Sequence, residues 1–240
     1  MSDGMFMVIL IAGLAAAAGF GTWYSWKRAK ERREALAALA DQLGMRFDAA
    51  KDYGHDERYT NFEIFRRGHS RAAFNTLTGP VPINGSPHPV VMGDFIYKVT
   101  SGSGKKRRTT TYRFSYAIVH LPLVGVPDLL IRPEHVFDKL GSMLGFDDID
   151  FESAEFSRKF LVKSNDKRFA YDVVTPAMME FLLETRGHAP AIDLEHGMLC
   201  LAQGGKRWTP EQFRSALAFA DRFLSLWPEH VVTDLRSRAG

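Results

Sequence analysis

The sequence is poor in cysteine, and it contains neither an internal repeat nor a low-complexity segment. Cys200 is its single cysteine, so an intrachain disulfide is excluded, which suits a reducing compartment. The eight histidines are scattered without the H-x-H or H-x-x-x-H spacing of metal ligands. With one cysteine and no such spacing, the sequence predicts neither a metal site nor a cofactor.

The chain also has little excess charge, with a formal net charge of +3. Residues 1–33 contain five basic and two acidic groups, which account for the whole excess, so the remainder is electroneutral. A nucleic-acid-binding domain normally carries a basic face of its own. We therefore expect no nucleic-acid partner.

One long uncharged run is present, over residues 5–26. As a helix it would be about 33 Å long, against about 30 Å for the hydrocarbon core of a bilayer. A cleaved signal peptide would carry Lys or Arg before the run, whereas the chain begins MSDG. A core helix would not be apolar around its whole circumference. Residues 1–26 are therefore predicted to be a transmembrane anchor.

Basic residues follow this run and none precedes it. Positive charge marks the cytoplasmic side of a span, so we expect a single-pass protein of the inner cell membrane, with its N-terminus outside and its C-terminal domain cytoplasmic. Trp23, Tyr24 and Trp26 would form an interfacial aromatic belt. The flanking cations would attract anionic lipid headgroups by about 1 kcal/mol each. They are Lys27, Arg28, Lys30, Arg32 and Arg33.

Small residues recur every four positions within the run, at Gly13, Ala17 and Gly21. This spacing permits close helix packing in membranes. Self-association through this face is a hypothesis that the sequence raises, although an Ala/Gly-rich run also produces such spacing by chance.

Residues 27–44 are predicted to continue as a basic flank and helical stalk. They are rich in helix formers, and Leu36, Leu39 and Leu43 share one face. Gly44 is a suitable helix terminator. Residues 45–240 then form the cytoplasmic domain.

Within that domain, strand patterns are β-branched and aromatic runs bounded by turn residues. Residues 48–60 are polar and predict a connection, and residues 79–89, with four prolines, predict a loop. Strands are expected at residues 90–100 and 109–121, which form a hairpin, at 128–131 and 156–162, and at 191–194 and 198–202, which form a second hairpin.

Helices are expected where a cap precedes an amphipathic run. Pro133 would open a helix to about residue 144, and Thr175-Pro176 one to about Thr185. Thr209 to Gln212 form a capping box before a helix that Pro228 ends. Hairpins joined by isolated helices predict an α+β fold, with one mainly antiparallel sheet and helices packed on it.

Two glycine-containing segments are rejected as catalytic motifs. Residues 68–72 resemble a nucleophile elbow, but too few residues precede Ser70 to build the parallel sheet that this motif requires. Residues 102–105 lack the spacing of a phosphate-binding loop and join two strands. The cations beside them are either a solvated turn or a contact for anionic lipid or an acidic partner. They are Lys105, Lys106, Arg107 and Arg108.

The acidic segment at residues 147–155 is the remaining candidate. A calcium loop beginning at Asp148 would need Gly at its sixth position, where Ser153 stands. We expect its carboxylates to pair with local cations. No catalytic residue is predicted.

Four motifs, RRGHSRAAFN, IRPE, DIDFES and EFSRKF, resemble a family of bacterial single-pass membrane-anchored proteins of unknown function. The resemblance covers roughly residues 66–183. It implies the anchored topology and a bacterial origin, and no activity.

These observations favour a membrane-anchored, non-enzymatic binding or scaffold module. The alternatives are an anionic-lipid-recognition domain and a hydrolase that uses Asp148, Asp150 and Glu152, with Arg132. A cleft that gathers these carboxylates with a histidine would favour the hydrolase, and a solvent-facing acidic loop would favour binding.

Overall fold

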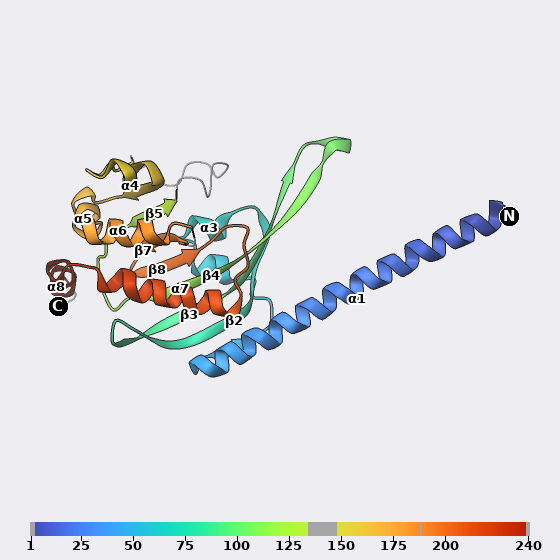
Figure 1. The fold of residues 1–240 in the computed structure, drawn as a ribbon, viewed down its shortest axis with the longest axis horizontal. Helices are drawn as coiled ribbons and strands as arrows, with labels where there is room; N and C mark the ends of the chain where they lie inside the picture. Colours follow the sequence, from blue (N-terminus) through green and yellow to red (C-terminus); the bar gives the residue numbers. More distant parts are fainter. Residues whose placement is uncertain (1–2, 134–147, 188, 239–240) are drawn as a thin grey trace.

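The computed structural model describes residues 3–133, 148–187 and 189–238, which form a long helix followed by an α+β domain (Figure 1). The domain contains an antiparallel sheet of eight described strands, in the order β1-β2-β3-β4-β8-β7-β5-β6. The α+β class expected from the sequence is confirmed. The strands are β1 (Arg46–Asp48), β2 (His69–Ile83), β3 (Ser86–Ser101), β4 (Arg108–His120), β5 (Leu129–Pro133), β6 (Phe160–Ser164), β7 (Ala191–Glu195) and β8 (Met198–Ala202).

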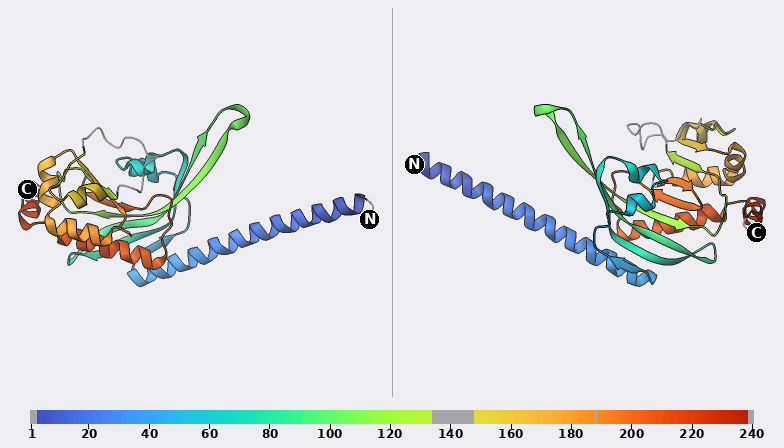
Figure 2. Two further views of the ribbon diagram at one scale, coloured as in Figure 1. Left: turned by 45° about the horizontal axis from the view of Figure 1, so that its top comes forward. Right: turned by 180° about the vertical axis from the view of Figure 1, so that it is seen from behind.

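Helices cover both faces of the sheet. Figure 1 shows α7 lying across one face, and the rear view in Figure 2 shows the short α2 and α3 on the other. The larger core lies on the α7 side and the smaller, aromatic-rich core beneath α2 and α3. The described helices are α1 (Asp3–Leu43), α2 (His55–Arg58), α3 (Glu63–Arg66), the 3₁₀ turn η1 (Gly104–Lys106), α4 (Ala154–Lys159), α5 (Lys167–Val173), α6 (Pro176–Thr185), α7 (Pro210–Ser225) and α8 (Glu229–Ser237).

The predicted helix starts and hairpins with strong local signals are confirmed. The Thr209 hydroxyl accepts from the Gln212 backbone N–H, and the Gln212 side chain accepts from Thr209 N–H. At the start of α6, the Thr175 hydroxyl accepts from the Met178 backbone N–H. The hairpins β3–β4 and β7–β8 lie where the sequence placed them.

Helix α1 is continuous over 41 residues, and its two halves have different surroundings. The first half projects from the domain (Figure 1), whereas Leu36, Leu39 and Ala40 near its end are completely buried. Gly44 ends it with a φ of 65° and donates to Asp41 O, while Met45 donates to Ala40 O. This is a Schellman cap. The predicted stop is confirmed, but the end of the expected stalk is part of the core.

The membrane-spanning segment expected over residues 5–26 is not confirmed. Within the described part of the chain, no helix combines enough length with enough apolar character to cross a membrane.

The loop predicted over residues 79–89 is wrong, because β2 and β3 pair through it to a two-residue turn. Asn84 and Gly85 both have positive φ, 49° and 74°, as a type I′ turn requires. Pro80 is opposite Pro89, and Pro82 opposite Pro87, at alternating positions. The paired prolines make no ladder hydrogen bond to each other. They also lie outside the stretches of β2 and β3 that pair with β1 and β4, so the missing N–H of each proline removes no hydrogen bond from the sheet.

Other boundaries also differ. The strand predicted at 156–162 begins at Phe160, because the Ser153 hydroxyl accepts from Phe156 N–H and starts α4. Pro133 is the last residue of β5 and not the start of a helix, and the rest of the helix predicted to about residue 144 falls outside the described residues. The predicted connection at 48–60 contains α2, and α8 follows Pro228.

Candidate functional site

The projecting half of α1 exposes large apolar side chains. Phe20 is 65% exposed, Trp23 51% and Trp26 58%. Their rings lie beside cations one turn further along the helix: Lys27 Nζ is 5.5 Å from the Trp23 ring, and Lys30 Nζ is 5.8 Å from the Trp26 ring. Alternating aromatic rings and ammonium groups are typical of a helix at a membrane–water interface.

The five flanking cations do not share one environment. Lys27, Arg28 and Lys30 are exposed, and Arg33 is half-buried. Lys27 and Lys30 lie 4.0 Å and 3.8 Å from glutamates one turn along, contacts that contribute little at an exposed surface. Lys27, Arg28 and Lys30 therefore remain accessible to an anionic surface. The remaining cation, Arg32, has a partner within the domain.

Arg32 joins α1 to the sheet. Its Nε donates to Asp94 Oδ2 at 2.6 Å and its Nη2 to Asp94 Oδ1 at 2.5 Å, a bidentate pair in which Asp94 is fully buried. Asn75 and Ser115 also donate to Asp94, at 3.1 Å and 2.7 Å. Arg32 Nη1 reaches Trp208 O at 3.0 Å, before α7. The Arg32 guanidinium is therefore held by the domain, whereas the sequence grouped Arg32 with the possible lipid contacts.

The tip of the β3–β4 hairpin carries the second cationic group. Ser101 pairs with Arg108, and Gly102, with φ of 79°, begins the turn that contains η1. Lys106, Arg107 and Arg108 are exposed, and the Lys105 side chain lies outside the described part of the chain. In all three views the hairpin and the projecting half of α1 extend from the same side of the domain (Figures 1 and 2).

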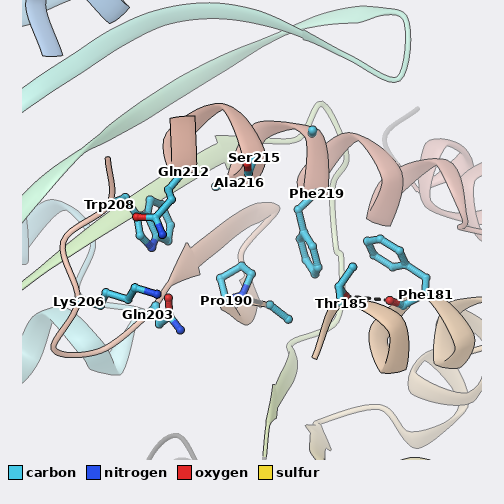
Figure 3. Close-up of a pocket in the computed structure, with 12 residues that line it drawn as sticks. Phe181, Thr185, Pro190, Gln203, Lys206, Trp208, Gln212, Ser215, Ala216 and Phe219 are labelled. Carbon is cyan, nitrogen blue, oxygen red and sulfur yellow. Dashed lines mark hydrogen bonds between the residues drawn. The ribbon is translucent and has the colours of Figure 1, made fainter. Parts of the chain in front are cut away.

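A pocket of about 380 Å³ lies between α6, α7 and the segment that joins β8 to α7 (Figure 3). Its apolar wall includes Phe181 and Phe219, whose ring centroids are 5.0 Å apart, and the buried Trp208. Gln203 and Lys206 lie at one end. This volume is in the range of small-molecule pockets, and the lining suits an apolar ligand with a polar end.

The carboxylates of the acidic loop that the structure describes are exposed to solvent. Asp148, with its side chain 61% exposed, pairs with Lys163 at 3.0 Å, and Glu155 pairs with Lys159. Asp150 is exposed, and Asp147 falls outside the described residues. Within the described residues, no group of His, Cys, Asp or Glu is arranged to hold a metal ion. The expected pairing with local cations is confirmed for Asp148 and Glu155.

Sequence reasoning missed a buried carboxyl pair on β7. Asp193 and Glu195 are 7% and 5% exposed, and Asp193 Oδ1 and Glu195 Oε1 have no hydrogen-bond partner. Burial, and next the Glu195 charge, raise the pKa of Asp193 well above its usual value. Burial also raises the pKa of Glu195 to about 7. Arg132 and Asp193 line an adjoining cavity of only 30 Å³, which admits water but no substrate.

Comparison with known proteins finds a similarity of fold. The crystal structure of the mycobacterial trehalose monomycolate transport factor A, TtfA, matches with a TM-score of 0.58 and 10% identity, over 82% of this chain and 96% of that chain. No family model and no curated protein matches the chain. The chain therefore has a TtfA-like fold, while the resemblance to a single-pass membrane family stays an expectation.

Proposed function

We propose that this chain is a non-enzymatic binding module, attached to a membrane by the projecting half of α1, that serves the transport of cell-envelope lipids. The observation that carries the proposal is the division of α1 at Arg32. Beyond this residue the helix is held in the core, and before it the helix exposes aromatic and cationic side chains away from the domain.

The exposed aromatic side chains supply the driving force for attachment. Burial of a large apolar side chain is worth about 1.5–3 kcal/mol, so the exposed Phe20, Trp23 and Trp26 are costly in water and stable in lipid. Lys27, Arg28 and Lys30 would then lie at headgroup level. Because Arg32 ties the same helix to the sheet, the domain would be held close to the surface.

The transport role rests on fold analogy. The similar structure is named as a trehalose monomycolate transport factor, and we infer that this chain serves a related process. A non-enzymatic role is supported by the acidic loop, whose Asp148 faces solvent and pairs with Lys163.

The basic hairpin tip is proposed as a second contact with the same membrane. It projects on the α1 side of the domain, and three of its cations are exposed. At about 1 kcal/mol per basic residue near an anionic surface, they supply about 3 kcal/mol. An acidic patch on a membrane-protein partner is the competing occupant.

Cell fractionation tests attachment. The full chain with a C-terminal fluorescent reporter should sediment with membranes and stay there after an alkaline carbonate wash, whereas a variant lacking residues 1–26 should be released. A full chain recovered in the supernatant would refute the proposal. Reporters at each end also test the sequence-based topology, with the N-terminus outside and the domain cytoplasmic.

A fluorophore at the hairpin tip tests the second contact. The native Cys200 is buried, so a Ser103→Cys variant can be labelled selectively at the tip with an environment-sensitive dye. The dye should shift to shorter wavelength in vesicles with anionic lipid and not in phosphatidylcholine alone. Replacing residues 105–108 by Ser and Gln should abolish the shift, while replacing the exposed Arg113 on the hairpin arm should not. A shift that survives the fourfold replacement would exclude the tip as a headgroup contact.

A further inference from the structure

A second pocket, of about 340 Å³, lies where α2 meets the edge of the sheet formed by β1 and β2. Its lining is polar, unlike that of the pocket in Figure 3. The residues concerned are Arg46, Asp48, Ala50, Asp52, His55, Arg58, Tyr59, Thr76, Thr78 and Val91.

His55 forms the inner wall of this pocket. It is 1% exposed, and its ring lies 4.7 Å from that of Tyr59 and 4.8 Å from those of Phe65 and Tyr116. Its Nε2 has no hydrogen-bond partner. Burial lowers the pKa of His55 to about 4, so the imidazole is neutral under physiological conditions. A ring nitrogen of a neutral imidazole in the pocket wall can form one hydrogen bond with a ligand, as donor or acceptor according to its tautomer.

Thr76 also lines the pocket, and its hydroxyl interacts with the buried hydroxyl of Tyr116. Thr76 lies at an irregularity of β2, where the register with β3 shifts between Phe74 and Leu77. Such a bulge redirects side chains. A buried polar atom without a partner costs about 1–3 kcal/mol, so the unpaired His55 Nε2 indicates a position that a ligand completes.

The outer part of the pocket is electrically balanced. Asp52 accepts from Arg58, and the pocket also contains Arg46 and Asp48, so two carboxylates face two guanidinium groups. Neither sign prevails, which disfavours a charged ligand. Hydroxyl groups, which both donate and accept, fit a wall that offers acceptors and donors side by side.

An apolar trough of about 310 Å³ adjoins this pocket and shares Thr78 and Val91 with it. Its remaining lining is Gly79, Pro80, Pro89, Val90 and His120. Thr78, Pro80 and Pro89 are exposed, because α2 and α3 cover only part of this face and the turn end of β2–β3 extends past them (Figure 2). Tyr59, which lines the polar pocket, and His120, which lines the trough, lie next to each other, with Tyr59 Oη 3.5 Å from His120 Nε2.

We propose that this paired site binds a neutral amphiphile, with a carbohydrate headgroup in the polar pocket and an acyl chain along the trough. The inference rests on the proposed function and specifies its ligand class. Ring hydroxyls would engage His55, Thr76 and the charged residues of the outer wall, Tyr59 would face the sugar ring, and the proline-rich surface would cover the chain.

Photochemical crosslinking tests the proposal on the full chain in phosphatidylcholine nanodiscs. The probe is an alkyl maltoside that carries a diazirine near the end of its chain. It should label the peptide of residues 78–91, as mapped by mass spectrometry. Thr78→Trp places a bulky ring at the junction without touching the core, and labelling should fall about tenfold, which equals about 1.4 kcal/mol of lost affinity. His55→Phe keeps a ring but removes the polar atom, and should reduce labelling about fivefold, the effect of one hydrogen bond.

Three comparisons can overturn the inference. Thr111→Trp, an exposed threonine on β4, is the matched control and should label like the native chain. Undiminished labelling of Thr78→Trp would refute the site. Equal labelling by an alkyl sulfate probe would refute the carbohydrate preference. If free maltose competed against labelling as strongly as an unmodified alkyl maltoside, the role of the trough would be refuted. Loss of the native chain from the nanodisc would instead contradict membrane attachment, so the two failures are distinguishable.

Discussion

The contact between Arg32 and Asp94 predicts a large and specific loss of stability. We consider Arg32→Met, which keeps an unbranched apolar stem of similar size. The substitution removes both charge-assisted hydrogen bonds to Asp94 and the one to Trp208 O. It leaves the Asp94 carboxylate, which is 0% exposed, with only Asn75 and Ser115 as donors.

The magnitude follows from this burial. Removing one partner of a buried ion pair costs about 3–5 kcal/mol, because the other charge is left uncompensated. The Arg32 side chain is itself 17% exposed, so we expect the lower end, about 3 kcal/mol. For a chain of this size that corresponds to a decrease in Tm of about 6–12 °C. Asp94→Asn should cost less, about 2 kcal/mol, since the guanidinium left behind can reach water.

Thermal unfolding of the full chain in detergent, followed by near-ultraviolet circular dichroism, measures these effects. The double variant should be more stable than the sum of the single effects implies, by more than about 1 kcal/mol, because Asp94→Asn removes the stranded charge. Lys30→Met is the matched control, since Lys30 is exposed and its contact with Glu34 is worth less than about 1 kcal/mol. If Arg32→Met unfolded at the temperature of Lys30→Met, the proposed joint between α1 and the sheet would be wrong.

Three further predictions concern two buried titratable groups and the projecting half of α1. The pKa of His55 is about 4 in the folded chain, below its ordinary 6.5, so the unfolded chain takes up the proton first and stability falls as pH drops from 6.5 to 4, by up to about 3 kcal/mol. Glu195 changes stability in the opposite direction over the same range, so the effect of His55 is measured as the difference in urea unfolding free energy between the native chain and His55→Phe. This difference should change by about 2 kcal/mol between pH 7 and pH 4.5, and an unchanged difference would contradict the assignment. Glu195 has the opposite sign, because its pKa of about 7 lies above the ordinary 4.5 and its contribution is lost as pH rises from 4.5 to 7. Glu195→Gln should therefore raise stability at pH 8 by up to about 3 kcal/mol and change it little at pH 4, and an equal effect at both would count against this explanation. Ala17→Leu should weaken self-association in a membrane two-hybrid assay if Gly13, Ala17 and Gly21 form a packing face, and unchanged association would exclude that face.

Elements whose signals are local were predicted well. The cap of α7 depends on Thr209 and Gln212, three positions apart, and the stop of α1 depends on the positive φ of Gly44. Both can be read in a window of a few residues. The partner of a strand cannot be read in such a window, so the prolines of residues 79–89 predict a loop. The structure instead has a hairpin there. Asn84 and Gly85 form its turn, and the prolines face each other across the strands without interrupting the ladder.

The candidate sites were mostly beyond prediction, because long-range pairing creates them. Arg32 and Asp94 are 62 positions apart, and nothing in the run of five flanking cations distinguishes Arg32 from its neighbours. His55 lies in a polar segment without periodicity, where burial was not expected. It is buried because α2 packs over the aromatic residues Phe95 and Tyr116 of two later strands. The four successive cations of the hairpin tip, in contrast, are visible in the sequence itself, and their contact with a membrane stays a prediction.

The joint at Arg32 also bears on how the proposed membrane contacts would work together. A helix tethered through a loose linker would leave the domain free to tilt, and a few exposed cations would then be screened beyond about 8 Å at physiological ionic strength. Here the helix that would enter the lipid is the same helix that Asp94 holds against the sheet, and the hairpin extends from the same side. The tip would therefore sample positions near the headgroups more often than a flexible tether allows. Neutralising the tip should consequently alter the tilt of the domain and leave its membrane residence intact, whereas loosening the joint by Arg32→Met should weaken the contact of a tip whose charges are unchanged.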